Sequence, residues 1–136
     1  MIDEVDCFDK YMNELKQGDE MILKDTHNIK SEAIADATGV TRKMLLPRSE
    51  TPNFEMRCFT IQPGGEMPRH TNEVEHEQFV ISGRARIGIA DDEFDVQYGS
   101  IILIPANVPH WYKNTGTEVF QFLCLVSNQD DTITYI

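Results

Sequence analysis

Three of the four histidines of the chain stand in two short polar segments that follow turn residues. His70 and His76 lie six residues apart in the segment RHTNEVEHE, and His110 stands in the segment PANVPHWY. Neutral imidazole is a preferred ligand of Fe, Ni, Cu and Zn, so three such side chains could bind one metal ion and leave coordination positions open. The alternative interpretation is that each histidine is an ordinary turn or strand-edge residue.

The elements that must position these histidines are short strands. From Gly39 onward, runs rich in Ile, Val, Phe and Thr alternate with turn residues such as Pro63-Gly64-Gly65 and Ser82-Gly83. Many short strands separated by turns are typical of an all-β sandwich or barrel. The predicted strands cover residues 40–46, 54–61, 77–81, 84–89, 94–96, 101–104, 108–113 and 119–126.

The N-terminal part of the chain has a different pattern. Phe8, Tyr11, Met12 and Leu15 recur at helical spacing, which predicts a short amphipathic helix over residues 6–17. Residues 19–38 are polar and predict no firm element. We therefore expect an N-terminal extension over residues 1–38, with its short helix, and one β domain over residues 39–136.

Composition excludes several classes of function. The 136 residues include 12 Lys and Arg against 23 Asp and Glu, a formal net charge of −11, which disfavours nucleic-acid binding. No apolar run approaches the roughly 20 residues of a membrane helix, and the acidic start is unlike a secretory signal. Cys7, Cys58 and Cys124 form no C-x-x-C pair, so we expect reduced thiols in a cytoplasmic protein.

Two motifs resemble those of the cupin superfamily. Residues 64–83 read G-x5-H-x-N-x3-H-x6-G, similar to the first cupin motif, G-x5-H-x-H-x3,4-E-x6-G. Residues 99–114 read G-x5-P-x-N-x2-H-x3-N, similar to the second, G-x5-P-x-G-x2-H-x3-N. With flanking strands the resemblance covers roughly residues 40–126. It implies a double-stranded β-helix, the cupin jelly-roll barrel, closing around a pocket.

The resemblance is closest to small manganese-type cupins, in which four histidines hold the metal. It implies that His70, His76 and His110 bind a divalent ion (Mn, Fe, Ni or Zn). Asn72 stands in place of the fourth histidine and is a candidate ligand, because an amide carbonyl can bind a metal weakly. A second assignment replaces His76 with Glu77, which would give the two-histidine, one-carboxylate set of non-haem Fe(II). Neighbouring strand residues point to opposite faces, so only one of these two can enter the barrel, and the motif spacing favours His76.

Strand alternation extends this assignment to other residues. With His76 inside, Gln78 and Val80 share its face. The resemblance also implies that Cys124, in the run FLCL, is a pocket-lining residue, whereas the alternative interpretation is a buried small hydrophobe. Asn107 replaces a motif glycine and tolerates a positive φ better than most residues. Four arginines lie near the motifs and are possible partners of a substrate carboxylate, but we interpret each as a solvated surface cation. They are Arg57, Arg69, Arg84 and Arg86.

The function implied first is a metal-dependent enzyme acting on a small organic molecule. Dioxygenase chemistry leads, with isomerase, lyase or decarboxylase activity as alternatives, and the sequence identifies no general base. Two other hypotheses are a non-catalytic cupin that binds or senses a small ligand, and a degenerate cupin without metal. By analogy with small cupins we expect a homodimer, with no nucleic-acid or membrane partner.

Overall fold

The computed structural model describes residues 20–136, and the predicted helix over residues 6–17 lies outside this range. The described residues form ten strands and one 3-10 turn, η1 (Thr26–Asn28), so the prediction of an all-β fold is confirmed. No helix among them is long and apolar enough to cross a membrane.

Each predicted run overlaps one of the strands β2 to β9, and the two short strands β1 and β10 were not predicted. The strands are β1 (Ser31–Ala33), β2 (Thr38–Leu46), β3 (Phe54–Asn72), β4 (His76–Ser82), β5 (Arg84–Ile89), β6 (Asp92–Gln97), β7 (Ile101–Ile104), β8 (His110–Lys113), β9 (Phe120–Ser127) and β10 (Ile133–Tyr135).

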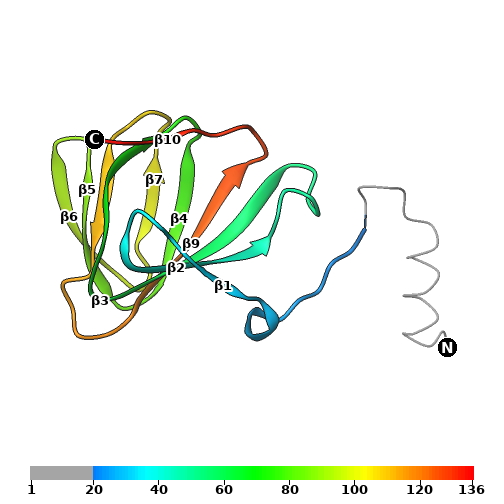
Figure 1. Cartoon of the computed structure of the whole chain (residues 1–136), viewed down its shortest axis with the longest axis horizontal. Coiled ribbons are helices and arrows are strands. Elements are labelled where there is room, and N and C mark those ends of the chain that lie inside the picture. The colour runs from blue at the N-terminus through cyan, green and yellow to red at the C-terminus, as the bar shows by residue number, and fades with distance from the viewer. Residues whose placement is uncertain (1–19) are drawn as a thin grey trace.

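The strands form one sheet that rolls around the core into a barrel (Figure 1). Its order is β6-β5-β8-β3-β9-β4-β7, and β2 and β10 also pair with β3 while β1 pairs with β2. The first part of β3 pairs with β2 and β9, and its second part pairs with β8 and β10. One strand therefore runs through both sides of the barrel and holds them together.

The length of β3 corrects one prediction. Pro63-Gly64-Gly65 was expected to end the strand, but the strand continues through it to Asn72. Gly64 takes a φ of +79°, which its missing side chain permits, so the strand bends instead of ending. The bend is anchored because the Gly64 N–H donates to the Asn114 carbonyl and the Asn114 N–H donates to the Gly65 carbonyl. The bent end of β3 carries His70.

The segment before Gly39 is attached to the barrel. Strand β1 pairs with β2 through registers such as Ser31 with Lys43. The division of the chain at residue 39 remains a prediction, and β2 itself begins at Thr38.

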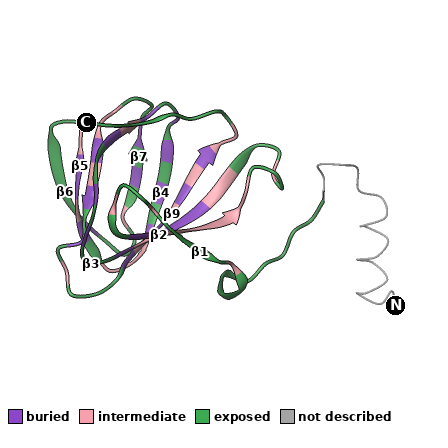
Figure 2. Ribbon diagram, viewed as in Figure 1, coloured by how far each residue is buried: buried purple, intermediate pink, exposed green. Residues whose placement is uncertain are grey.

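The core fills the space inside the rolled sheet, and buried positions alternate with exposed ones along the strands (Figure 2). On β4, Gln78 and Val80 are buried while Glu77 and Phe79 are exposed, which confirms the predicted inward face. On β9, Phe120, Phe122, Cys124 and Val126 are buried on one face, and the ring of Phe122 stacks on those of Phe59 and Tyr112. The strand faces of the core were thus predictable from period-2 patterning.

At one glycine, Gly83, the neighbouring backbone approaches so closely that any side chain is expected to lower the free energy of unfolding. Gly83 joins β4 to β5 with a φ of +78°, and an added Cβ would lie 2.3 Å from the Val119 carbonyl oxygen. Gly99 has a φ of +89° but faces open space. Gly99→Ala should therefore lower the free energy of unfolding by about 1–2 kcal/mol through backbone strain alone, and Gly83→Ala by clearly more, as measured by urea unfolding. Equal losses in the two variants would show that the contact at Val119 imposes no constraint.

Candidate functional site

The three predicted histidines come together inside the barrel. His70 lies on β3, His76 on β4 and His110 on β8, and all three side chains are buried. The register between β3 and β8 places His70 opposite His110, and their ring centroids are 4.2 Å apart. The rings of His76 and His110 are 5.9 Å apart. Three side chains separated by up to 40 positions in the sequence therefore lie close together in the fold.

Backbone hydrogen bonds orient two of these rings in the same way. The Nδ1 atom of His70 is 2.7 Å from the Pro68 carbonyl oxygen, and that of His110 is 2.9 Å from the Val108 carbonyl oxygen. A carbonyl oxygen only accepts, so Nδ1 carries the proton in both rings. Each ring consequently keeps an unprotonated Nε2, the form in which imidazole binds a metal.

Two further buried atoms have no hydrogen-bond partner in the described structure. They are Nε2 of His76 and Oδ1 of Asn72. The other end of the Asn72 amide is fixed, because its Nδ2 donates to Asp131 Oδ2 at 2.9 Å. A buried polar atom without a partner costs about 1–3 kcal/mol, so these two atoms mark a place where a ligand would restore the missing interaction.

Burial keeps the three imidazoles neutral. Loss of solvation lowers the pKa of His76 to about 3, helped by the positive charge of Arg57. Loss of solvation also lowers the pKa of His110 to about 4 and lowers that of His70. At neutral pH all three rings can therefore donate a lone pair, as metal binding requires.

The histidines and Asn72 line one cavity of about 60 Å³. Enclosed water occupies roughly 10–15 Å³ on this measure, so the cavity holds only a few small atoms or molecules. Strand β10 contributes Ile133 and Tyr135 to the lining, and the Tyr135 ring lies 5.7 Å from that of His70. The C-terminal strand is thus part of the site.

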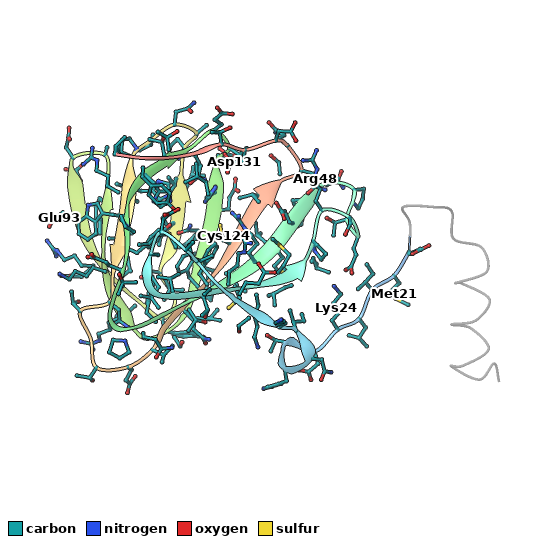
Figure 3. The ribbon with its side chains drawn as sticks, viewed as in Figure 1. Met21, Lys24, Arg48, Glu93, Cys124 and Asp131 are labelled. Carbon is teal, nitrogen blue, oxygen red and sulfur yellow. The ribbon has the colours of Figure 1, made fainter. Side chains whose placement is uncertain are left out.

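A buried polar network supports the wall of the cavity. Gln78 and the Tyr112 hydroxyl exchange hydrogen bonds of 2.7 and 2.9 Å, and burial raises the pKa of Tyr112. The Cys124 sulfur lies 3.6 Å from each of three nitrogens, Gln78 Nε2, Arg57 Nη2 and His76 Nδ1. Cys124 is fully buried in the barrel interior, whereas Asp131 lies in the segment leading to β10 (Figure 3). The thiol therefore contacts three polar residues that line the cavity, without lining the cavity itself.

Not every candidate enters this cavity. Glu77 is exposed on the outer face of β4, so the geometry does not bring the carboxylate of the second assignment to the histidines. His27, the fourth histidine, is exposed at the surface, where its Nδ1 lies 2.7 Å from Asp25 Oδ1. Asn107 has a φ of +66°, which confirms its predicted role, and its N–H donates to the Asn72 carbonyl and so joins the two motif loops.

The arrangement fits a metal in its donor types but is not a preformed coordination shell. Within residues 20–136, no group of three or more His, Cys, Asp or Glu side chains has the mutual spacing of a metal site. The rings of His70 and His110 are tilted by 55° and lie against each other. Binding one ion would require the Nε2 atoms to turn toward a common point, a side-chain movement within the cavity.

The prediction that Arg57 is a solvated cation is wrong. Its side chain is buried, with 9% exposed, and it lines the cavity together with Arg42. Strand parity could have shown this, because residue 57 shares its face with buried Phe59 and Ile61. By contrast, Arg86 is a surface residue that pairs with carboxylates on β6.

Other contributors had no signal in the sequence. Asp131 and Tyr135 follow the last predicted strand, beyond the window in which the motifs and strand pattern were identified. Their role depends on β10 returning to pair with β3, a long-range contact that local patterning does not indicate.

Comparison with curated proteins finds two relatives whose sequences are similar to part of this chain. Auxin-binding protein 1 of Arabidopsis thaliana is 34% identical over 77 residues, which are 50% of this chain and 39% of that protein. The 1-methylthio-D-xylulose 5-phosphate methylsulfurylase of Rhodospirillum rubrum is 26% identical over 102 residues, 75% of this chain and 65% of that protein. The chain therefore spans less than two thirds of the length of either.

Solved structures share the fold at low sequence identity. The polyketide cyclase RemF from Streptomyces resistomycificus superposes with a TM-score of 0.80 at 23% identity, covering 86% of each chain. Oxalate decarboxylase from Lactobacillus farciminis superposes with a TM-score of 0.67 at 20% identity, covering 81% of this chain and 34% of that one. The cupin domain family itself matches residues 57–126, just over half of the chain. Because this match covers more than half of the chain and includes the three histidines of the cavity, the protein belongs to the cupin domain family.

Proposed function

We propose that this cupin binds a divalent metal ion through His70, His76 and His110, with Asn72 Oδ1 as a fourth ligand, and acts on a small organic molecule as a metal-dependent enzyme of the dioxygenase type. The observation that carries the proposal is the convergence of three neutral imidazoles in one small buried cavity. Protein groups outside the ligand set support it, because the carbonyls of Pro68 and Val108 keep the Nε2 atoms of His70 and His110 unprotonated.

The supporting groups suit particular metals. The carbonyls of Pro68 and Val108 hold two rings with Nε2 unprotonated, and Asp131 holds the Asn72 amide with Oδ1 unpartnered. His76 presents its Nε2 lone pair when Nδ1 carries the proton and donates to the nearby sulfur. An amide oxygen is a harder donor than imidazole, so Asn72 makes the set more suitable for Mn²⁺ or Fe²⁺ than three imidazoles alone would be.

The side chains around the ligands favour some reactions over others. A bound divalent ion would supply Lewis acidity and, for iron or manganese, redox chemistry. Among residues 20–136 no Asp or Glu lines the cavity, and burial raises the pKa of Tyr112 and of Tyr135, so both phenols stay protonated. The cavity thus offers hydrogen-bond donors but no carboxylate base. This favours oxidative cleavage or decarboxylation over isomerisation, which needs a side chain to move a proton.

The relatives are consistent with an enzyme but do not select its reaction. A polyketide cyclase, an oxalate decarboxylase and a methylsulfurylase share the fold or part of the sequence, and one fold can serve several chemistries. The auxin-binding relative favours the second candidate, a cupin that binds a small ligand without turnover. Metal-loaded protein that binds ligand but turns over none of a panel of small acids under O2 would support that candidate.

The compartment and partners are part of the proposal. Cys58 and Cys124 are both free and buried, which supports the cytoplasm, where thiols stay reduced. The net charge of −11 supports a small-molecule partner over nucleic acid.

The first prediction concerns metal content. Purified protein should hold about one equivalent of metal by elemental analysis, and adding Mn²⁺ or Fe²⁺ to metal-free protein should raise its melting temperature, because a ligand that binds only the native state stabilises it. His76→Ala and His110→Ala should lose this metal, and Asn72→Ala should bind it roughly tenfold more weakly. His27→Ala is the matched control, since His27 lies at the surface. Full metal content in His76→Ala or His110→Ala would show that the ligands are assigned incorrectly.

The buried neutral histidines should make the free energy of unfolding depend on pH. The unfolded chain binds protons at its histidines near pH 6.5, whereas the folded metal-free chain binds them only near pH 3–4 at His76 and His110. The free energy of unfolding should therefore be constant above about pH 7 and fall below pH 6.5, by about 1.4 kcal/mol per pH unit for each histidine that stays neutral. Urea unfolding of metal-free protein at pH 7.5 and pH 5.5 measures this loss. His76→Gln should reduce it and His27→Gln should not; an unchanged slope in His76→Gln would contradict the buried neutral state.

The homodimer expected from the resemblance has a candidate surface. On the outer face of β4 and β7, Phe79, Ile101 and Leu103 expose apolar side chains, Ile101 to 82% and Leu103 to 56%. The Tyr98 ring packs edge-on against Phe79 at 6.3 Å and extends this surface. Exposed apolar side chains gathered on a sheet favour pairing with another copy. We propose that two copies associate through this face.

Light scattering tests the dimer. The intact protein should have twice the 15.6 kDa mass of one chain, and Leu103→Lys should reduce the mass to that of a monomer, because an unpaired charge in the interface is costly to bury. Leu23→Lys is the control, since Leu23 is almost fully exposed on the segment before β1. A monomeric wild type, or a Leu103→Lys variant that stays dimeric, would rule out this interface.

A further inference from the structure

The unpartnered buried polar atoms of the structure gather in one place. Among residues 20–136, five buried side-chain nitrogen or oxygen atoms lack a hydrogen-bond partner, and four of the five residues line the histidine cavity. Two of the four atoms are the proposed metal-binding atoms of Asn72 and His76. The other two are Nε of Arg42 and Nε of Arg57, which are hydrogen-bond donors. Their concentration in one cavity indicates a ligand with acceptor atoms.

Arg57 carries a charge that no ion pair within residues 20–136 neutralises. Its guanidinium lies 5.4 Å from the centroid of the Phe59 ring, and its Nη2 donates to the Cys124 sulfur at 3.6 Å. It forms no ion pair with any carboxylate in the described part of the chain. A buried cation held only by an aromatic face and a thiol is expensive, and a bound anion would offset that cost.

Arg42 adds a second donor with less charge. It lies on β2 opposite Phe59 in the register with β3, and its Nη2 donates to Glu32 Oε2 at 3.0 Å. Glu32 therefore neutralises part of the charge of Arg42, and the Nε–H of Arg42 remains without a hydrogen-bond partner. The cavity thus contains two guanidinium N–H donors and one uncompensated positive charge.

We propose that Arg57, with Arg42, binds the carboxylate of a short organic acid in this cavity, and that the substrate of the enzyme is such an acid. The assignment of a substrate rests on the proposed function, whereas carboxylate binding itself does not need the metal. A planar carboxylate matches the planar guanidinium and its parallel N–H donors better than a tetrahedral phosphate does. The cavity volume of about 60 Å³ limits the acid to a few carbon atoms.

The position of Arg57 relates the anion to the histidines. The Cys124 sulfur contacts both Arg57 Nη2 and His76 Nδ1, so one atom separates the anion-binding cation from a proposed metal ligand. An acid held at Arg57 would have its remaining atoms beside the histidines, with its orientation set by the guanidinium. Arg57 would then be a binding residue that positions the acid.

The test uses the full chain after metal removal, with malonate as probe and malonamide as its uncharged counterpart of the same size. Malonate should bind saturably and shift the Nε–H signals of Arg57 and Arg42 in an NMR titration, because these protons gain an acceptor. Malonamide and inorganic phosphate should bind at least about tenfold more weakly. Malonamide binding as tightly as malonate would overturn the proposal, and phosphate binding more tightly would overturn the choice of a carboxylate.

Variants assign the effect to Arg57. Arg57→Met keeps an apolar stem of similar length and should weaken malonate binding at least about tenfold, whereas Arg57→Lys should retain part of it. Arg86→Met, which removes a surface arginine already paired with Glu93 and Asp95, should bind malonate like the wild type. Unchanged binding in Arg57→Met, or an equal loss in Arg86→Met, would overturn the assignment. If Arg57→Met does not fold, two other measurements test the proposal. They are malonate binding by Arg57→Lys and the comparison of malonate with malonamide on the wild-type protein.

Elemental analysis separates this inference from the proposed function. Arg57→Met should keep the metal content of the wild type, since Arg57 is not a proposed ligand. Malonate binding in a wild-type protein that takes up no metal would leave the carboxylate site standing and reject the metal enzyme. Metal uptake without malonate binding would reject the carboxylate site and leave the proposed metal site standing.

Discussion

The pairing of the bent strand β3 with β8 is the constraint on which the site depends. Gly64 lets β3 turn without ending, and reciprocal backbone hydrogen bonds with Asn114 hold the turn in place. Only because β3 continues beyond this bend does its far end reach β8, where His70 faces His110. A strand that ended at Pro63 would leave the first histidine motif on a loop, without a fixed partner across the sheet.

Low polarity around the cavity then determines its chemistry. Loss of solvation lowers the pKa of the histidines and raises that of Tyr112, so the rings are neutral donors and the phenol remains a proton donor. In the same surroundings an unpaired guanidinium is costly, and Arg57 gives a positive interior to a protein whose net charge is −11. Neutral imidazoles and a buried cation together match the proposed binding of a small anion.

Much of the barrel was predictable from local pattern, because strand alternation and turn residues act over a few positions. The inward face of β4, with Gln78 and Val80 beside His76, follows from the period of two. The motif spacing also selected the histidines that meet. The prediction failed at Pro63-Gly64-Gly65, since the same residues can end a strand or bend it, and only pairing with Asn114 decides between the two.

The amino-acid sequence by itself determined the all-β class, the strand faces and the three histidines, because these depend on residue type and short-range spacing. Tertiary structure alone decided what surrounds the histidines. It returned β10 to β3 so that Tyr135 lines the cavity, and it placed Asp131 against the Asn72 amide. It also left Arg57, whose burial strand parity could have indicated, without an ion pair to any carboxylate of residues 20–136. Such long-range contacts depend on how the sheet closes, and no local pattern records that closure.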